Sequence, residues 1–281
     1  MDDLEKTHPR ALLSAWGLRP KKKFGQNFLM DSGAAHRIAR LSLIDAPAHA
    51  RVLEIGAGTG VLTQALLDEG AAVTAIEIDT QLVDVLRSRE ELRGADIVHA
   101  DAMQFDYASY AALGPWYAAG NLPYNIATPL IVDLVEMERG PDAMTMMIQK
   151  DVADRLAAKP GTAAYGSLSI AVQYAMRVER AFTLGPRAFY PAPKVDSTVV
   201  RLVRRAEPAV RPRDLALFRK VVRAAFAYRR KTLANSLALA LGIERAHIAK
   251  AIAASSLSTE SRGEQLDLND FCRLADKLAG E

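Results

Sequence analysis

The chain has a single cysteine, Cys272, and no long apolar run. One cysteine excludes an intramolecular disulfide and a cysteine-based zinc site, so we expect no metal centre. No stretch approaches the roughly 18 uninterrupted apolar residues that a membrane helix needs. The polar start, residues 1–5, does not resemble a signal peptide. These absences predict a cytoplasmic globular protein without a membrane partner.

The length and the apolar content indicate more than one folded domain. With 281 residues, half of them hydrophobic, the chain can bury a sizeable core. The composition changes at Glu207-Pro208, and Asp214 is placed to cap an amphipathic helix. We therefore predict a large domain over residues 1–205 and a small all-α domain over residues 206–281.

Charge is distributed unevenly along the chain, although the net value is only +3. Residues 6–30 carry six Lys or Arg and no acid, and residues 201–231 carry eleven against two acids. Residues 77–142 carry twelve acids against four arginines. If the two basic segments converge, they form a positive rim that can neutralise phosphates. A set of solvated surface helices is the competing interpretation.

Short β-branched runs alternate with helical periodicity in the first two hundred residues. The expected strands are residues 51–55, 72–78, 95–99, 116–119 and 144–149, with helices over 60–69 and 80–89 between the first three. Such alternation predicts an α/β fold with a parallel, doubly wound sheet. Ligands bind such sheets just beyond the carboxyl ends of the strands.

A glycine loop follows the first expected strand. Gly56, Gly58 and Gly60 form G-x-G-x-G, whereas a dinucleotide fingerprint has its third glycine or alanine where Val61 stands. Glu77 ends the second strand, where an acid can accept both hydroxyls of an unphosphorylated ribose. Asp101, after the third strand, is placed to accept from an adenine amine. S-adenosylmethionine, with an adenosine, no pyrophosphate and a positive sulfonium, fits this set best.

The segment Asn121-Leu122-Pro123-Tyr124 points to the methyl acceptor. A planar exocyclic amine is a poor nucleophile because its lone pair is delocalised into the ring. The Asn121 oxygen and a nearby backbone carbonyl can accept its two N–H groups, and Tyr124 can stack on the ring. Together with the donor loop, these residues predict methyl transfer to a planar amine within a Rossmann-like methyltransferase fold.

At this point the chain resembles a known family, the ribosomal RNA adenine N6-dimethyltransferases, and in particular its bacterial small-subunit (16S) members. The resemblance spans almost the whole sequence. The motifs that carry it are Lys22–Leu29, Glu54–Gly60, Glu77–Asp79, Asn121–Tyr124, Phe189–Ser197, Arg229–Leu233 and Asn235–Leu237.

The resemblance implies a role for particular positions. The methyl donor would be surrounded by Asn27, Leu29, Gly56, Gly58, Glu77, Asp101 and Asn121. The target adenine would be held by Asn121, Leu122 and Tyr124, with Phe189 closing the other face. RNA would be contacted by Lys21, Lys22, Lys23, Arg219, Lys220, Arg223, Arg229, Arg230 and Lys231. Without the resemblance, Phe189 is as well explained as a core aromatic.

The resemblance also implies a substrate. It indicates a monomer that uses S-adenosylmethionine to dimethylate two adjacent adenosines near the 3′ end of small-subunit ribosomal RNA, in the pre-30S subunit. One departure is Ser167, where similar proteins often have a basic residue, and it puts one RNA contact in doubt.

Two alternatives stay open at the level of sequence. Similar loops serve other planar amines, in DNA adenine, large-subunit RNA adenine or a protein amide. The chain could also be an assembly factor of ribosome biogenesis whose catalysis is secondary.

Overall fold

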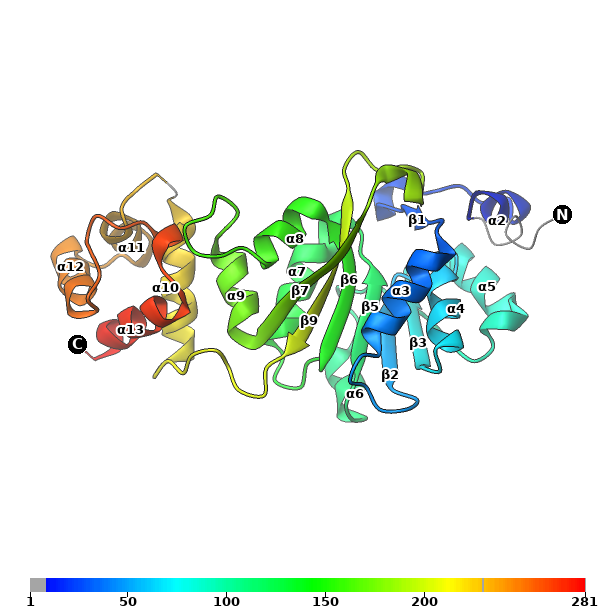
Figure 1. The fold of residues 1–281 in the computed structure, drawn as a ribbon, viewed down its shortest axis with the longest axis horizontal. Helices are drawn as coiled ribbons and strands as arrows, with labels where there is room; N and C mark the ends of the chain where they lie inside the picture. The colour runs from blue at the N-terminus through cyan, green and yellow to red at the C-terminus, as the bar shows by residue number, and fades with distance from the viewer. Residues whose placement is uncertain (1–8, 229, 281) are drawn as a thin grey trace. The chain divides into compact units, whose positions relative to one another are not determined.

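The computed structural model describes residues 9–228 and 230–280. The chain divides into two compact units. The first comprises Met1–Ala153 and Glu179–Arg204, and the second comprises Asp154–Val178 and Arg205–Glu281. Figure 1 gives the course of the chain through both.

A seven-stranded sheet forms the centre of the first unit. Its order is β4-β3-β2-β5-β6-β9-β7. The strands are β2 (Arg51–Ile55), β3 (Ala72–Glu77), β4 (Asp96–His99), β5 (Tyr117–Asn121), β6 (Ala143–Gln149), β7 (Met176–Leu184) and β9 (Ser197–Arg204). β4, β3, β2, β5 and β6 pair in parallel, whereas β9 pairs with β6 antiparallel. The predicted α/β fold and all five predicted strands are confirmed, with ends shifted by at most two residues.

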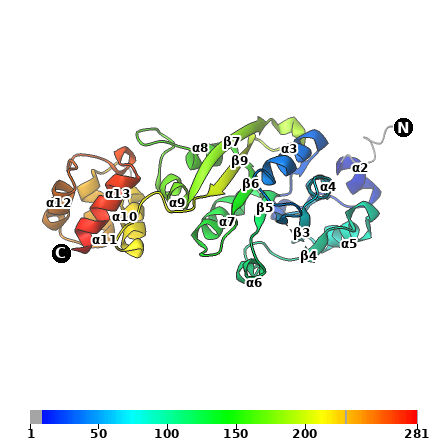
Figure 2. The same cartoon turned by 60° about the horizontal axis from the view of Figure 1, so that its bottom comes forward.

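Helices lie on both faces of this sheet. They are α3 (Ser32–Ser42), α4 (Val61–Asp68), α5 (Thr80–Ser88), α6 (Tyr107–Ala112), α7 (Tyr124–Glu136) and α8 (Lys150–Leu156), preceded by α2 (Pro9–Ala15). Asp31, Asp79 and Asp106 cap α3, α5 and α6, because each carboxylate accepts a backbone N–H of the first helical turn. α3 and α4 lie on one face and α7 on the other (Figures 1 and 2).

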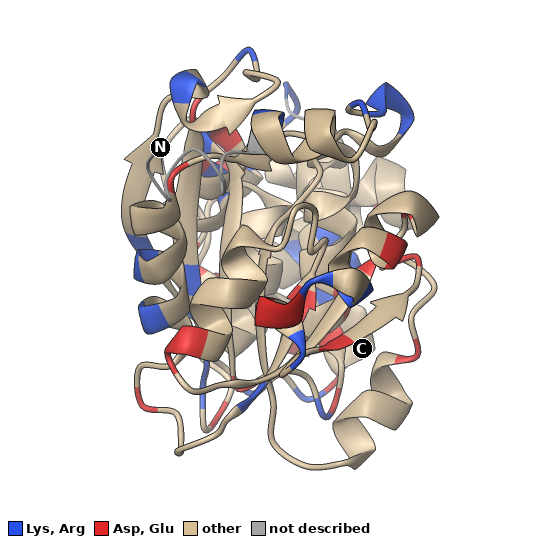
Figure 3. Ribbon diagram, turned by 90° about the vertical axis from the view of Figure 1, so that its right-hand side faces the viewer, with Lys and Arg blue, Asp and Glu red and all other residues tan. Residues whose placement is uncertain are grey.

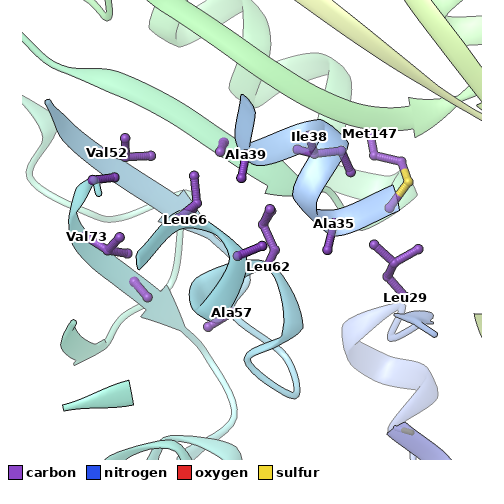
Figure 4. Close-up of a cluster of buried hydrophobic side chains, with 14 of the residues drawn as sticks. Leu29, Ala35, Ile38, Ala39, Val52, Ala57, Leu62, Leu66, Val73 and Met147 are labelled. Carbon is purple, nitrogen blue, oxygen red and sulfur yellow. The ribbon is translucent and has the colours of Figure 1, made fainter. Parts of the chain in front are cut away.

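The main core of the first unit lies between the sheet and the two helices α3 and α4. Figure 4 shows Leu66 of α4 near Val52 and Val73 of neighbouring strands, and Ile38 of α3 beside Met147 of β6. All five are at most 4% exposed. Full burial of such a side chain stabilises the fold by about 1.5–3 kcal/mol. This packing fixes α4 against β2, and therefore fixes the loop that joins them.

A small second sheet was not predicted. Phe28 and Leu29 form β1 (Phe28–Leu29), which pairs antiparallel with β8 (Phe189–Tyr190). Phe28 lies opposite Tyr190, and Leu29 lies opposite Phe189. Strands of two residues show no periodicity in the sequence. The ladder attaches the N-terminal segment to the segment that carries Phe189.

The second unit is mainly helical. It contains α9 (Ser167–Ala175), α10 (Leu215–Ala227), α11 (Leu233–Leu241), α12 (Arg245–Ala254) and α13 (Leu268–Ala279). Its core includes Phe218, Leu237 and Phe271. Asp214 caps α10 as expected, because its carboxylate accepts the Leu217 N–H. None of the helices in the described part of the chain is long and apolar enough to cross a membrane.

The domain division predicted from sequence needs one correction. The expected change near residue 206 coincides with the boundary after Arg204, but residues 154–178 belong to the helical unit. Tyr165 and Ile170 pack into the helical core, and the Tyr165 hydroxyl donates to the Leu266 carbonyl at 2.9 Å. These contacts join residues about a hundred positions apart, which no local pattern indicates.

Candidate functional site

A pocket of about 240 Å³ opens at the carboxyl ends of the central strands. Its walls come from the N-terminal segment, from the glycine loop, and from the residues that follow β3, β4 and β5. Every residue expected around a methyl donor lines it: Asn27, Leu29, Gly56, Gly58, Glu77, Asp101 and Asn121. Leu122 and Tyr124, expected to hold the acceptor, line the same pocket. The structure thus brings the two predicted half-sites together.

The glycine loop depends on residues without a side chain. Gly56 and Gly58 have φ values of 80° and 58°, in the left-handed region that other residues rarely adopt. A Cβ atom on Gly58 would lie 3.0 Å from the Phe28 ring. Since Phe28 belongs to the N-terminal segment, glycine here lets that segment lie directly on the loop.

Glu77 is held by two backbone groups at the end of β3. Its carboxylate accepts the Gly58 N–H at 2.9 Å and the Asp79 N–H at 3.0 Å, and the residue is 6% exposed. Burial raises the pKa of Glu77, and the two hydrogen bonds partly offset that effect. A carboxylate has about four acceptor sites. Glu77 therefore retains capacity to accept hydroxyl groups of a ligand in the pocket.

Asp101 lies in the turn that follows β4. Its carboxylate accepts the Met103 N–H at 2.9 Å and the Gln104 side-chain amide at 3.2 Å. These bonds fix the side chain where it lines the pocket. Asp101 is thus held by neighbours in its own turn and is placed as an acceptor at the pocket.

Glu54 is a pocket residue whose burial the sequence did not reveal. It is 1% exposed and accepts the Thr63 hydroxyl at 2.6 Å. Burial raises the pKa of Glu54 to about 8; the Thr63 hydrogen bond opposes this shift, and the nearby Glu77 charge reinforces it. The available signal was an acid placed between the apolar residues Leu53 and Ile55.

The charges of the lining favour a cationic ligand over a polyphosphate. The ionisable side chains among the lining residues are Lys23, Glu54, Glu77 and Asp101. Three acids and one lysine suit a molecule with hydroxyls, an amine and a positive centre. The negative charge of a pyrophosphate would instead lie next to the buried acids Glu54 and Glu77, which is unfavourable.

Asn121, the last residue of β5, is oriented by the N-terminal segment. Its side-chain amide donates to the backbone carbonyl of Asn27 at 2.7 Å. This bond occupies the Nδ2 end, so the Oδ1 end is the one available to an incoming N–H group. The Leu122 N–H donates to the Met147 carbonyl at 3.0 Å, which fixes the backbone beyond Asn121.

Tyr124 and Phe189 differ in their exposure to the pocket. Tyr124 begins α7 and lines the pocket, with its hydroxyl 3.3 Å from the Ser197 Oγ. Phe189 is 3% exposed, packs in the main core and does not line the pocket in the described chain. Phe189 pairs with Leu29, which lines the pocket, and shares a buried cluster with the lining residues Ile38 and Met147. Its role as a second wall for the base stays a prediction.

The basic residues predicted to contact RNA fall into two groups, one in each unit. In the first, Lys22 is exposed, Lys23 lies over the Phe24 ring, and the Lys21 ammonium is 2.7 Å from Asp79 Oδ1. Lys21 is therefore engaged within the protein, which the sequence did not indicate. The second group consists of Arg219, Lys220 and Arg223 on α10, followed by Arg230 and Lys231. Arg229 lies outside the described residues.

Comparison with known proteins gives one consistent family. The model of the family "Ribosomal RNA adenine dimethylase" matches residues 17–279. The "Ribosomal RNA small subunit methyltransferase A" of Pseudomonas aeruginosa is 48% identical over 263 residues, covering 93% of this chain and 95% of its own length. The protein of the same name from Streptococcus gordonii is 42% identical over 283 aligned positions, covering 97% and 96%.

Solved structures agree with this result. A dimethyladenosine transferase from Plasmodium falciparum superposes with a TM-score of 0.73 at 25% identity, covering 88% of this chain and 95% of that one. The 23S rRNA methyltransferase ErmE gives a TM-score of 0.70 at 27% identity, covering 90% and 100%. The Rossmann-like methyltransferase fold expected from the sequence is confirmed.

The raised pKa of Glu54 predicts how stability depends on pH. The folded protein holds a proton that the unfolded chain releases between pH 4.5 and about 8. The contribution of this bound proton to the free energy of unfolding is fully present below pH 4.5 and is lost as the pH rises through about 8. Glu54→Gln should therefore show a flatter decline of the urea midpoint over this window than the unaltered protein. Glu90→Gln, at an exposed carboxylate, is the control; identical curves for all three proteins would contradict the prediction.

Proposed function

This chain belongs to the ribosomal RNA adenine dimethylase family, and on that premise we propose that it dimethylates the N6 amine of adenosines in small-subunit ribosomal RNA. The methyl donor is S-adenosylmethionine, and the target is two adjacent adenosines near the 3′ end of that RNA, in the pre-30S particle. The observation that most supports this proposal is the shared pocket of the donor residues and of Asn121, Leu122 and Tyr124. The protein would act as a monomer in the cytoplasm, where small subunits are assembled.

The chemistry of the pocket fits the proposed donor. Glu77 would accept the ribose hydroxyls, and Asp101 would accept from the adenine amine. Gly56 has φ of 80° and no side chain, which lets the ligand approach the loop backbone. The positive sulfonium would favour the ionised forms of the buried acids Glu54 and Glu77. When bound, the donor supplies an electrophilic methyl group next to a neutral thioether leaving group.

The protein's contribution to the reaction is mainly positioning. The Asn121 Oδ1 and the Leu122 carbonyl would accept the two N–H groups of the target amine, which localises its lone pair toward the methyl group. The Asn27 carbonyl holds the Asn121 amide in the required orientation. Tyr124 would stack on the base, and Phe189 would close its other face. No dedicated general base is needed, since the amine proton becomes acidic only after the methyl group has been transferred.

The target adenosine must leave any helix before it can enter this pocket. An amine inside a base-paired stack is unreachable, so the base is either in a loop or flipped out. Transfer of a second methyl group also requires space for the first one on N6.

A large-subunit RNA adenine is the alternative acceptor that a specific observation favours, namely the structural likeness to ErmE. Its 27% identity is lower than the 48% and 42% to the two small-subunit enzymes. Parallel assays with small and large subunits separate the two acceptors. An assembly factor with secondary catalysis would instead bind the small subunit and transfer little.

Basic residues of the helical unit are proposed to hold the RNA backbone. Figure 3 marks Lys and Arg apart from Asp and Glu and shows both signs of charge on the ribbon. Lys220 and Arg223 are exposed on α10, and Arg230 and Lys231 are exposed just after it. Contacts of this kind release counterions from the phosphates, so binding weakens as salt increases.

We predict that Asn121→Ala abolishes transfer. The measurement is transfer of labelled methyl groups from S-adenosylmethionine to small subunits that lack the modification, followed by nucleoside analysis. The unaltered protein should yield dimethyladenosine. Asn121→Ala should lower kcat by at least about 100-fold, the usual effect of removing one polar group from a reacting centre, and should retain part of its donor affinity. The control is Asn269→Ala, an exposed asparagine of α13; full activity of Asn121→Ala would refute the mechanism.

We also predict that Lys220→Met weakens small-subunit binding. Loss of one phosphate contact should reduce the slope of log affinity against log salt by about 1. Lys277→Met, an exposed lysine of α13, removes the same charge elsewhere in the helical unit. Equal salt slopes for the two variants would argue against α10 as the RNA-contacting helix.

A further inference from the structure

Asp79 makes an unusual number of contacts for a helix-capping residue. Its Oδ1 accepts the Lys21 ammonium at 2.7 Å and the Gln81 N–H at 3.2 Å, and its Oδ2 accepts the Gln26 side-chain amide at 3.1 Å. Its own N–H donates to Glu77 at 3.0 Å. The Asp79 side chain is 4% exposed. A cap alone needs only the bond to Gln81.

Lys21 and Gln26 delimit one end of the segment that covers the pocket. Besides Asp79, the Lys21 ammonium reaches the Gln81 side chain at 2.7 Å, and the Lys21 N–H donates to Gln26 Oε1, also at 2.7 Å. These bonds form a closed polar cluster. The cluster joins the beginning of the segment 21–29 to the N-terminus of α5.

The same segment contacts the other loops of the pocket further along. Phe28 lies on the glycine loop at Gly58. Asn27 accepts from Asn121, and Gly25 lies against Pro123 and Asn125. The segment therefore touches the loops after β2, β3 and β5, and the Asp79 cluster is its attachment to the loop after β3.

We propose that Asp79 is a positioning residue for methyl-donor binding, because its carboxylate fixes the segment 21–29 over the pocket while its backbone N–H fixes the Glu77 carboxylate. The role rests on the proposed function, since it concerns the same donor. A segment already fixed loses little conformational freedom when the donor binds. Without the cluster, part of the binding free energy would be used to order the segment.

The electrostatics of the cluster agree with this role. Burial acts to raise the pKa of Asp79, but the hydrogen bonds from Lys21 and Gln26 outweigh it and lower the pKa below its usual value. Asp79 is thus a buried anion whose charge is compensated by a lysine that is itself 31% exposed. Removing one partner of such a pair lowers the free energy of unfolding by more than removing one partner of an exposed ion pair does.

Asp79→Asn separates positioning from helix capping. Asparagine caps a helix about as well as aspartate, so the cap to Gln81 is retained. The variant loses the charge that holds Lys21, and it places an amide where Gln26 donates. Lys21→Met removes the ammonium from the other side, and Lys21→Arg keeps the charge. Arg93→Met removes an exposed ion pair with Glu90 and is the control.

Titration calorimetry of the full-length variants with S-adenosylhomocysteine tests the proposal. Asp79→Asn and Lys21→Met should each weaken binding by about tenfold, and the double variant should be no weaker than either alone, because the two act as a pair. The affinity of Lys21→Arg should remain within about threefold of that of the unaltered protein, and the affinity of Arg93→Met should equal that of the unaltered protein. In the transfer assay, Asp79→Asn should raise the KM for S-adenosylmethionine and leave kcat at saturating donor nearly unchanged.

Two results would overturn the proposal. Unaltered affinity in Asp79→Asn, or additive losses in the double variant, would overturn the positioning role while leaving the proposed function intact. Failure of the unaltered protein to bind S-adenosylhomocysteine would instead overturn the donor assignment of the proposed function, and the positioning role with it.

Discussion

The parallel pairing of β2 with β3 and β5 is the constraint on which the rest of the structure depends. It places Ile55 beside Ile76 and Glu54 beside Ala119, so these strands end at one edge of the sheet. The glycine loop, the Glu77 carboxylate and the Asn121 amide all project from that edge because their strands end there. α3 and α4 cover one face of the sheet and keep the strands buried, which makes the position of each strand end hard to change.

Polar groups at this edge are arranged by neighbours from distant parts of the chain. Backbone N–H groups of Gly58 and Asp79 hold Glu77, and the Asn27 carbonyl holds Asn121. Burying Glu54 and Glu77 raises the pKa of both, so the folded protein carries acids in an unfavourable setting. Such a cost to stability is common where a site must be prepared for a charged ligand. The segment 21–29 completes the pocket by contacting three of its loops.

Much of this could be predicted from the sequence, because the central strands and the helices α4, α5 and α10 have clear periodicity, and Asp214 is a clear cap for α10. The glycine spacing and the acid at Glu77 also indicated the type of ligand. The β1–β8 pairing, the Lys21–Asp79 ion pair and the inclusion of residues 154–178 in the helical unit were not predicted. Each depends on contacts between residues far apart in the chain, which local patterns do not encode. The burial of Phe189 follows from the same ladder and leaves its role at the base a prediction.

The central claim is that donor and acceptor groups meet in one pocket, and a crystal structure of this chain with bound S-adenosylmethionine tests it most directly. We expect the ribose hydroxyls within hydrogen-bonding distance of the Glu77 carboxylate, the adenine amine at Asp101, and the methyl group directed toward the space bounded by Asn121 and Tyr124. A donor bound outside this pocket, or one whose methyl group points away from Asn121, would contradict the claim.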